Sequence, residues 1–479
     1  MRGITRLSGD RLRDMGESMP GISERHYRLR FALFACAMLL TALPAMAEDG
    51  HLHRPRGVPN PDVLTSDRDL PRREWAVEIH ALPGAFGKPG FEQQLTLKEA
   101  VSRALAYNPA VKAAFIEIEA RHGEELQAGV KPNPELLVEV ENFAGGRAQS
   151  VETTFSLTQA IELGDKRLKR LQAAHLDASL AGWDYEGVRV QVATAAARAF
   201  VDVITAQERI RVLREFVTIA EKTQTSVDAR VKGGKASPIE FDRSIVAAAR
   251  AKALVAGEQA RLAAAKRRLS IYWGSETVDF GAVTGRLGNG RGVPSLATLK
   301  SLIDNNPELA RWSDEVGRRI AQLDVEVSKS IPDIKFGAGV RHFADTDSAA
   351  AVATVSIPLQ FFDRNTGAIV AAEQRIAKAE QDREAARNSL LGSLAEAVGE
   401  LEVAAALLKA LETQVLPPAQ SAFERTKTGY DEGKFDILNV LDAQRAVFET
   451  RLDVLVARAD YEKARVRVEA IVGRDLGGL

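Results

Sequence analysis

The feature that most constrains this sequence is an internal duplication with an offset of about two hundred residues. Four landmarks recur in the same order: Asn108-Pro109 as Asn306-Pro307, Pro134-Glu135-Leu136 as Pro332-Asp333-Ile334, Phe155-Ser156-Leu157 as Val355-Ser356-Ile357, and Gly234-Lys235 as Gly433-Lys434. Their offsets are 198, 198, 200 and 199 residues. Unrelated short motifs would not stay in step over such a length. Each copy reads as short helices, two alternating strands, a very long helix, a tight glycine turn and a second long helix.

This order divides the chain into five predicted segments. They are a signal peptide at 1–47, an extended or disordered segment at 48–94, a first repeat at 95–290, a second repeat at 291–473 and a C-terminal tail at 474–479. Each repeat is expected to contain one β-hairpin and one helical hairpin. The β-hairpins are predicted over 131–161 and 331–361, and the long helices over 164–230 and 236–273 and over 366–428 and 435–472.

The amino terminus has the pattern of a secretory signal. Arg28 and Arg30 precede the apolar run 31–43, which is followed by the small-x-small site Ala45-Met46-Ala47. A run of this length is too short for a confident membrane span, and we expect cleavage before Glu48. The stretch before Arg28 is long for such a signal, so Met15 and Met19 are alternative starts.

The single cysteine, Cys36, lies inside the apolar run. The residues Leu33-Phe34-Ala35 before it faintly resemble the site at which bacterial lipoproteins are acylated, so a lipid anchor is an alternative to simple cleavage. The bulky Phe34 and the position of Cys36 disfavour this alternative. If cleavage follows Ala47, the mature chain has no cysteine for a disulfide framework or for thiolate chemistry.

Charge and motif content exclude several classes of function. The net charge is −1 and the isoelectric point is near 6.7, so no charge excess indicates nucleic-acid binding. The low aromatic content of 6% fits long packed helices better than a globular core. We find no phosphate-binding loop, nucleophile elbow or His-Glu-x-x-His helix. The sequence therefore predicts neither an enzyme nor a resident cofactor or metal.

The predicted strands alternate between apolar and polar residues. Leu136, Val138 and Val140 face away from Glu139 and Glu141, and the other three strands repeat this alternation. Alternation alone also suits a soluble, half-buried sheet. Two further observations favour a transmembrane β-barrel: a predicted strand length of about nine to eleven residues, and phenylalanines near strand ends or on the apolar face. The phenylalanines are Phe143, Phe155, Phe336, Phe343, Phe361 and Phe362.

Four strands cannot close a barrel that admits water, and an open sheet edge is not tolerated in lipid. The missing strands must come from other copies of the chain. Three copies would supply twelve strands, which leaves room for an open lumen.

The predicted helices are far longer than usual. Those starting near 166 and 366 extend over some sixty residues, which corresponds to roughly 95–100 Å. Leu441, Phe448 and Leu455 keep the seven-residue spacing of a coiled-coil seam. A kink or break is expected at Pro417-Pro418 because proline removes a backbone donor. The fold class is thus mainly α, with a transmembrane β-barrel and a long helical barrel built from a duplicated hairpin repeat.

These residues resemble the outer-membrane factors, the TolC-type efflux channels of Gram-negative bacteria. The resemblance covers about 95–473 and is carried by Leu95 to Ala100 leading to Asn108-Pro109, and by Gly429-Tyr430 through Gln444. It implies a homotrimer with a twelve-stranded barrel in the outer membrane and a helical tunnel through the periplasm. The trimer would serve a periplasmic adaptor, or membrane fusion protein, and an inner-membrane transporter of the resistance-nodulation-division type.

Several segments are similar to the cobalt-zinc-cadmium resistance branch of that family, which implies divalent metal cations as cargo. They are Ile116 to Arg121, Pro132 to Glu135, Glu139 to Asn142 and Ile161 to Gly164. Alternatively, the same duct exports drugs, solvents or secreted protein. A third alternative is a periplasmic coiled-coil adaptor without a pore, although such a protein would normally have a single helical hairpin.

The resemblance also implies roles for individual residues. Tyr430 and Asp442 match gate positions that close the periplasmic end, while Asn439 stands where an aspartate often occurs and Phe435 where an arginine can. Alternatively, Asp442 is an ordinary surface residue. The expected adaptor contacts are at the tips: Arg230, Lys232, Gly233, Gly234, Lys235, Gly433 and Lys434. Glu139, Glu141 and Glu152 are expected to line the lumen and favour cations, offset in part by Lys335 and Arg341.

Overall fold

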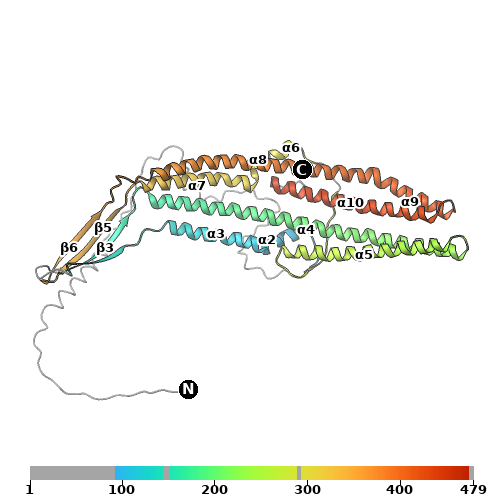
Figure 1. Cartoon of the computed structure of the whole chain (residues 1–479), viewed down its shortest axis with the longest axis horizontal. Helices are drawn as coiled ribbons and strands as arrows, with labels where there is room; N and C mark the ends of the chain where they lie inside the picture. The colour runs from blue at the N-terminus through green and yellow to red at the C-terminus, as the bar shows by residue number, and fades with distance from the viewer. Residues whose placement is uncertain (1–91, 144–150, 289–292, 474–479) are drawn as a thin grey trace, which may run out of the picture. The chain divides into compact units, whose positions relative to one another are not determined.

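The structure is a computed structural model that describes residues 92–143, 151–288 and 293–473 (Figure 1). The predicted signal peptide, Cys36, most of the predicted extended segment and the C-terminal tail lie outside these residues. The first copy of the repeat contains β1 (Glu92–Leu95), α2 (Leu97–Tyr107), α3 (Pro109–Ala128), β2 (Glu135–Glu141), β3 (Glu152–Ile161), α4 (Lys166–Lys232) and α5 (Pro238–Ile271).

The second copy has the same order of elements after a short connection. The connection and copy contain β4 (Phe280–Val283), α6 (Leu296–Lys300), a 3-10 turn (Ile303–Asn305), α7 (Pro307–Lys329), β5 (Ile334–Phe343), β6 (Ser348–Ser356), α8 (Thr366–Ala410), a π-helical segment (Leu411–Val415), α9 (Leu416–Asp431) and α10 (Ile437–Val472). α3 corresponds to α7, the β2–β3 hairpin to β5–β6, and the α4–α5 hairpin to α8–α9 with α10.

The duplicated Asn-Pro pairs begin equivalent helices. Asn108 caps α3 and Asn306 caps α7, and in each case a proline occupies the first turn. Both asparagine side chains accept a hydrogen bond from the backbone N–H two residues later, over 2.8 Å. Proline suits this position because its missing N–H would have no partner in the first turn.

The long helices lie side by side along their length (Figure 1). α4 is continuous over 67 residues and packs against α3, α5, α7 and α10. Small side chains make this close packing possible: Ala196, Ala199 and Val203 of α4 are almost fully buried. In the second copy, α8 packs against α7 and α10. Among the helices that the structure describes, none is both long and apolar enough to cross a membrane.

The long helical stretch from α8 to α9 is not uniform, and its irregular segment lies just before Pro417 and Pro418. The kink or break expected at Pro417-Pro418 takes the form of a π-helical segment, Leu411–Val415, in which the Leu416 N–H bonds to the carbonyl of Leu411. Both prolines lie in the first turn of α9, where their missing N–H groups are tolerated. The wider turn before them keeps the chain helical instead of breaking it.

The four-stranded sheet joins the two copies. Its order is β2-β3-β5-β6 and every neighbouring pair is antiparallel. β3 and β5, which belong to different copies, pair over ten residues from Glu152↔Phe343 to Ile161↔Ile334. β2 and β6 lie at the two edges. A separate parallel pair, β1 with β4, ties the start of the first copy to the connection between copies.

Register separates the side chains onto two chemically different faces. The polar face carries Glu139, Glu141, Glu152, Thr154, Ser156, Gly337, Gly339 and Arg341. The apolar face carries Leu136, Val138, Val140, Phe155, Leu157, Phe336, Val340 and Val355. Thr154 and Ser156 are buried, whereas Phe155 and Leu157 are exposed. The central polar side chains of β3 are thus covered, whereas the apolar side chains beside them are open.

A glycine allows this close approach on the polar face. Gly339 lies opposite Ser156, and a Cβ at Gly339 would come within 2.3 Å of the Phe155 carbonyl oxygen and 2.6 Å of the Ser156 Cβ. A side chain at Gly339 would therefore force the two central strands apart.

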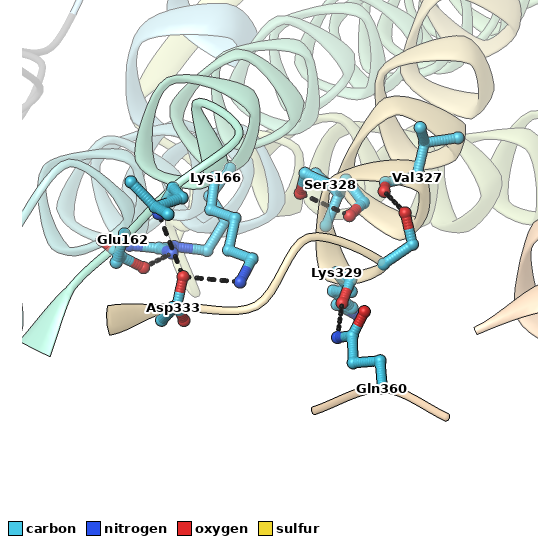
Figure 2. Close-up of polar contacts among 11 residues, drawn as sticks. Glu162, Lys166, Val327, Ser328, Lys329, Asp333 and Gln360 are labelled. Atoms are coloured by element: carbon cyan, nitrogen blue, oxygen red, sulfur yellow. Dashed lines mark hydrogen bonds and ion pairs between the residues drawn. The ribbon is translucent and has the colours of Figure 1, made fainter. Parts of the chain in front are cut away.

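Hydrogen bonds fix the junction between the sheet and the helices (Figure 2). Asp333, just before β5, accepts bonds from the Leu163 N–H at 3.0 Å and from the Lys166 ammonium at 2.6 Å. On the second copy's side, the Gln360 amide donates to the Lys329 carbonyl at 3.2 Å. Both strand-to-helix connections are thus anchored around the end of α7 and the start of β5.

Candidate functional site

The tips of the two helical hairpins are built by the same turn. At the first tip the Lys235 N–H bonds to the Arg230 carbonyl and the Gly234 N–H to the Val231 carbonyl. At the second tip the equivalent bonds run from Lys434 to Gly429 and from Gly433 to Tyr430. Gly234 and Gly433 have φ of 68° and 76°, a left-handed conformation that glycine adopts without strain. The duplicated Gly-Lys motif is therefore a helix-terminating turn.

The helices that return from the two tips begin differently. Ser237 and Glu240 form a reciprocal capping box at the start of α5. At the equivalent place in α10, Asp436 makes no side-chain capping bond, and Asn439 replaces the glutamate of the box. The second tip thus starts its returning helix with less local stabilisation than the first.

A hydrophobic cluster holds the two tips together. It contains Val227 of α4, Phe423 and Tyr430 of α9, and Ile437 and Val440 of α10, with Phe241 of α5 against it. These residues come from both copies of the repeat. The tips therefore pack as one unit within a single chain.

Arg230 and Tyr430 form the polar link of this cluster. The Arg230 guanidinium lies 4.4 Å from the centroid of the Tyr430 ring, a cation–π distance. Its Nη1 also donates to the Tyr430 carbonyl over 2.7 Å. The link joins the last turn of α4 to the last turn of α9.

The link leaves two buried polar atoms without a hydrogen-bond partner among the described residues: the Tyr430 hydroxyl and the Arg230 Nε. Tyr430 is only 3% exposed. Burial raises the pKa of the Tyr430 hydroxyl above its ordinary value, against the opposing effect of the Arg230 charge. The tyrosine is thus held in its neutral form.

The other predicted gate residues are placed differently from Tyr430. Asn439 and Asp442 are exposed on α10, outside the hydrophobic cluster. Within the described residues, no hydrogen bond or ion pair joins either of them to Tyr430. Phe435, at the position where the resemblance allows an arginine, is 49% exposed in the turn.

The predicted adaptor-contacting residues divide into two groups. Gly233, Gly234, Lys235 and Gly433 are exposed at the turns, and Lys232 and Lys434 are exposed beside local carboxylates, with Nζ 2.7 Å from Asp228 and 2.6 Å from Glu432. Arg230 differs because it is half-buried and bound to Tyr430. Sequence reasoning missed this contact, since nothing local marks two residues two hundred positions apart as neighbours.

The predicted lumen carboxylates share the polar face of the sheet. Glu141 and Glu152 are directly opposite each other, and Arg341 contacts both, at 3.3 Å and 2.9 Å. Arg341 Nε also donates to the Thr154 hydroxyl over 3.0 Å. Glu139 lies on the same face opposite Thr154. One arginine therefore neutralises much of the charge of two of the three carboxylates.

Within the described residues, no group of three or more histidine, cysteine, aspartate or glutamate side chains is placed to hold a metal ion.

Comparison with known proteins decides the family. The family described as "Outer membrane efflux protein" matches twice, over residues 100–275 and 298–474, and the two matches start 198 residues apart. This chain belongs to the outer membrane efflux protein family. The double match also shows that the internal duplication is the family's own repeat.

Known relatives of this efflux protein include metal resistance proteins. The cobalt-zinc-cadmium resistance protein CzcC of Cupriavidus metallidurans is 33% identical over 380 residues, covering 79% of this chain and 90% of the relative. The nickel-cobalt-cadmium resistance protein NccC of Alcaligenes xylosoxydans xylosoxydans is 25% identical over 58% of this chain and 64% of its own length.

Solved structures support the fold of the efflux protein. A crystal structure of CusC, studied for folding and transmembrane channel formation, matches with a TM-score of 0.67 at 15% identity and covers 83% of this chain and 97% of CusC. The predicted fold class, a helical barrel with a β-barrel, is confirmed. The predicted location, the outer membrane with a periplasmic helical extension, is also confirmed. Family membership implies a homotrimer that serves a tripartite pump.

Proposed function

We propose that this protein is the outer-membrane duct of a tripartite pump that exports divalent heavy-metal cations. The observation that carries the cargo is the 33% identity to the cobalt-zinc-cadmium resistance protein CzcC over 90% of that relative. The partners are a periplasmic adaptor and an inner-membrane transporter of the resistance-nodulation-division type. The energy for export comes from the transporter, because the duct itself is passive.

The export path runs along the polar face of the sheet and into the space enclosed by the helices. Glu139, Glu141 and Glu152 give the outer part of this path a negative potential that favours cations. Their placement on one face supports this role. Arg341 moderates the potential, so that cations enter without being held.

The periplasmic end closes at the hairpin tips. Tyr430 acts within the chain, where its ring and carbonyl receive Arg230. Asn439 and Asp442 act between chains, since both are exposed on α10 and free of the tip cluster. Opening requires α9 and α10 to move away from α4 and α5, which breaks the Arg230–Tyr430 link.

The adaptor contacts the exposed tips. Gly233, Gly234 and Gly433 leave the backbone of both turns accessible, and Lys232, Lys235 and Lys434 surround them with donors. Short side chains allow a partner helix to approach closely, and ammonium groups can bond to its terminal carbonyls. Arg230 contributes indirectly, by fixing the relative position of the two tips.

Growth of a strain that lacks this protein tests the proposal. The panel contains zinc, cobalt, cadmium, nickel and copper together with two unrelated drugs, and complementation uses the wild-type gene. Selective sensitivity to divalent metals is the expected result. Sensitivity to the drugs alone would contradict the metal cargo but retain the duct, and full resistance throughout would contradict both.

A further inference from the structure

We propose that the junction between the sheet and the helices binds anionic phospholipid headgroups of the periplasmic leaflet of the outer membrane. The junction consists of residues 161–170, 326–334 and 357–366. The inference rests on the membrane location of the family and is independent of the cargo.

The first observation is that the apolar face of the sheet continues into the junction. Val355 on β6, then Ile357 and Leu359 beyond it, keep the alternate-residue spacing, and Leu359 is 71% exposed. Phe361 and Phe362 follow and are also largely exposed. Aromatic side chains at the end of an apolar transmembrane surface are typical of the membrane–water interface. The junction therefore lies at headgroup level.

The second observation is that the junction is held in place by polar contacts from several directions. Asn365 donates its side-chain amide to the Glu326 carbonyl at 2.8 Å, and Gln360 donates to the Lys329 carbonyl. On the other side, Asp333 receives Lys166 (Figure 2). The exposed aromatic residues thus project from an anchored connection.

The third observation is how the charges of the junction are divided. Three cations of the junction have carboxylate partners: Lys166 pairs with Asp333, Arg170 with Glu162 and Lys329 with Glu326. Three other cations of the junction differ. Within the part of the chain that the structure describes, Arg167 and Lys169 have no carboxylate in ion-pair range, and Arg364 bonds only to the Gln360 carbonyl at 3.4 Å.

Arg167 and Arg364 are exposed and Lys169 is partly buried, and all three lie beside apolar side chains along the chain. Leu168, between Arg167 and Lys169, is 60% exposed, and Arg364 follows Phe361 and Phe362. Nearby anions are Asp165 and Asp363, and the Asp363 carboxylate already accepts the Asn365 N–H. Apolar side chains beside cations at an interface match anionic lipids, because the acyl chains contact the apolar side chains and the phosphates pair with the cations. The repetition of this pattern at both strand-to-helix connections favours a lipid surface over a single soluble ligand.

Native mass spectrometry of the full trimer tests the proposal. The protein is reconstituted in phosphatidylethanolamine with a minor fraction of phosphatidylglycerol, and retained lipids are counted. The test variant is R167Q/K169Q/R364Q, and the matched control is K409Q/R425Q/K427Q, which removes three exposed cations elsewhere. A second test variant, F361A/F362A, removes the apolar anchors and leaves the charges. A parallel arm adds inorganic phosphate to separate headgroup binding from simple anion binding.

The expected result is preferential retention of phosphatidylglycerol by the wild type and the control, and roughly tenfold weaker retention by R167Q/K169Q/R364Q. F361A/F362A should lose both lipids to a similar degree. Circular dichroism and trimer content verify that each variant is folded. Equal phosphatidylglycerol retention by the wild type and the triple variant would overturn the proposal. Displacement of the lipid by millimolar phosphate would also overturn it, in favour of a free anion site.

Discussion

The side-chain amide of Asn108 donates to the carbonyl of Tyr272 over 2.8 Å, and so joins the start of the first repeat to the end of its last long helix. Asn306 makes the equivalent bond to Ile471 over 2.7 Å. Each asparagine also caps the helix that follows it. Two duplicated side chains therefore close the two repeats in the same way.

Replacing Asn306 by alanine should lower the stability of the second repeat. The variant loses the helix cap, which is worth about 1 kcal/mol, and leaves the Ile471 carbonyl without its partner, at a cost of about 1–3 kcal/mol. The measurement is the thermal unfolding midpoint of the trimer in detergent. Asn306→Ser is the matched control, because serine keeps the cap but cannot reach Ile471; an intermediate midpoint is expected. Identical midpoints for all three proteins would show that neither bond matters.

Removing the Arg230 guanidinium should open the tips. Arg230→Gln loses the cation–π contact and the charged bond to the Tyr430 carbonyl, together about 1–2 kcal/mol in favour of the closed state. The open fraction in planar bilayers should rise roughly tenfold by that estimate. The control is Lys232→Gln, which lies two residues after Arg230 and pairs with Asp228, and this variant should behave as wild type. An open fraction that is unchanged in Arg230→Gln would show that the gate lies elsewhere.

Alkaline pH should open the same gate. Burial raises the pKa of Tyr430, whereas a released tyrosine ionises near pH 10. Between those two pKa values the closed state keeps the proton and the open state loses it, so closure weakens as the pH rises through this window and is unaffected below it.

Tyr430→Phe separates this effect from general alkaline unfolding, to which the half-buried Tyr185 and the buried Tyr461 also contribute, because burial raises the pKa of both hydroxyls. The phenylalanine keeps a ring for Arg230 and removes a hydroxyl that has no partner among the described residues. Its open fraction should stay constant where that of the wild type rises. A parallel rise in both channels would contradict the assignment.

Neutralising Arg341 should make the channel more cation-selective. In Arg341→Gln, Glu141 and Glu152 lose their shared counter-charge, and the three chains of the trimer contribute equally. The reversal potential under a salt gradient is the measurement, with Lys427→Gln as a control on the helices. A shift toward anions, or none, would argue against a lumen-facing position.

The Arg341→Gln substitution also leaves Glu141 and Glu152 facing each other without a counter-charge, which should cost about 0.2–1 kcal/mol of sheet stability.

Bulk at the first tip should block the adaptor. Gly234→Trp places a large side chain on an exposed turn, whereas Gly234→Asn tolerates the left-handed conformation and adds little volume. Crosslinking between this protein and the adaptor in whole cells should disappear in the first variant and persist in the second. Intact crosslinking of Gly234→Trp would count against adaptor binding at this tip.

Local chemistry made much of the fold predictable. Alternation assigned the strand faces because side chains on a strand repeat every two residues, and the glycine turns fixed where α4 and α9 end, just after Arg230 and Tyr430. The prolines Pro417-Pro418 predicted a kink or break, and the structure has an irregularity directly before them: the helix widens over Leu411–Val415 and stays helical, because both prolines lie in the first turn of α9.

The candidate site was less predictable, because its contacts connect distant parts of the chain. Asp442 and Asn439 could be assigned only through resemblance, and both are exposed outside the hydrophobic cluster that contains Tyr430. The pairing of Arg230 with Tyr430 depends on how the two hairpins pack, and no periodicity encodes it. The clamp that Arg341 forms on Glu141 and Glu152 depends on the register between β3 and β5. Local patterns determined the elements, and packing determined the site.

Metal retention by cells tests the central claim most directly. Cells lacking this protein, and the same cells complemented with the wild type, are loaded with radioactive zinc and transferred to zinc-free medium. The account predicts slow loss of zinc without the protein and rapid loss when it is restored, with equal retention of a radiolabelled drug in both strains. Equal rates of zinc loss in the two strains would contradict it.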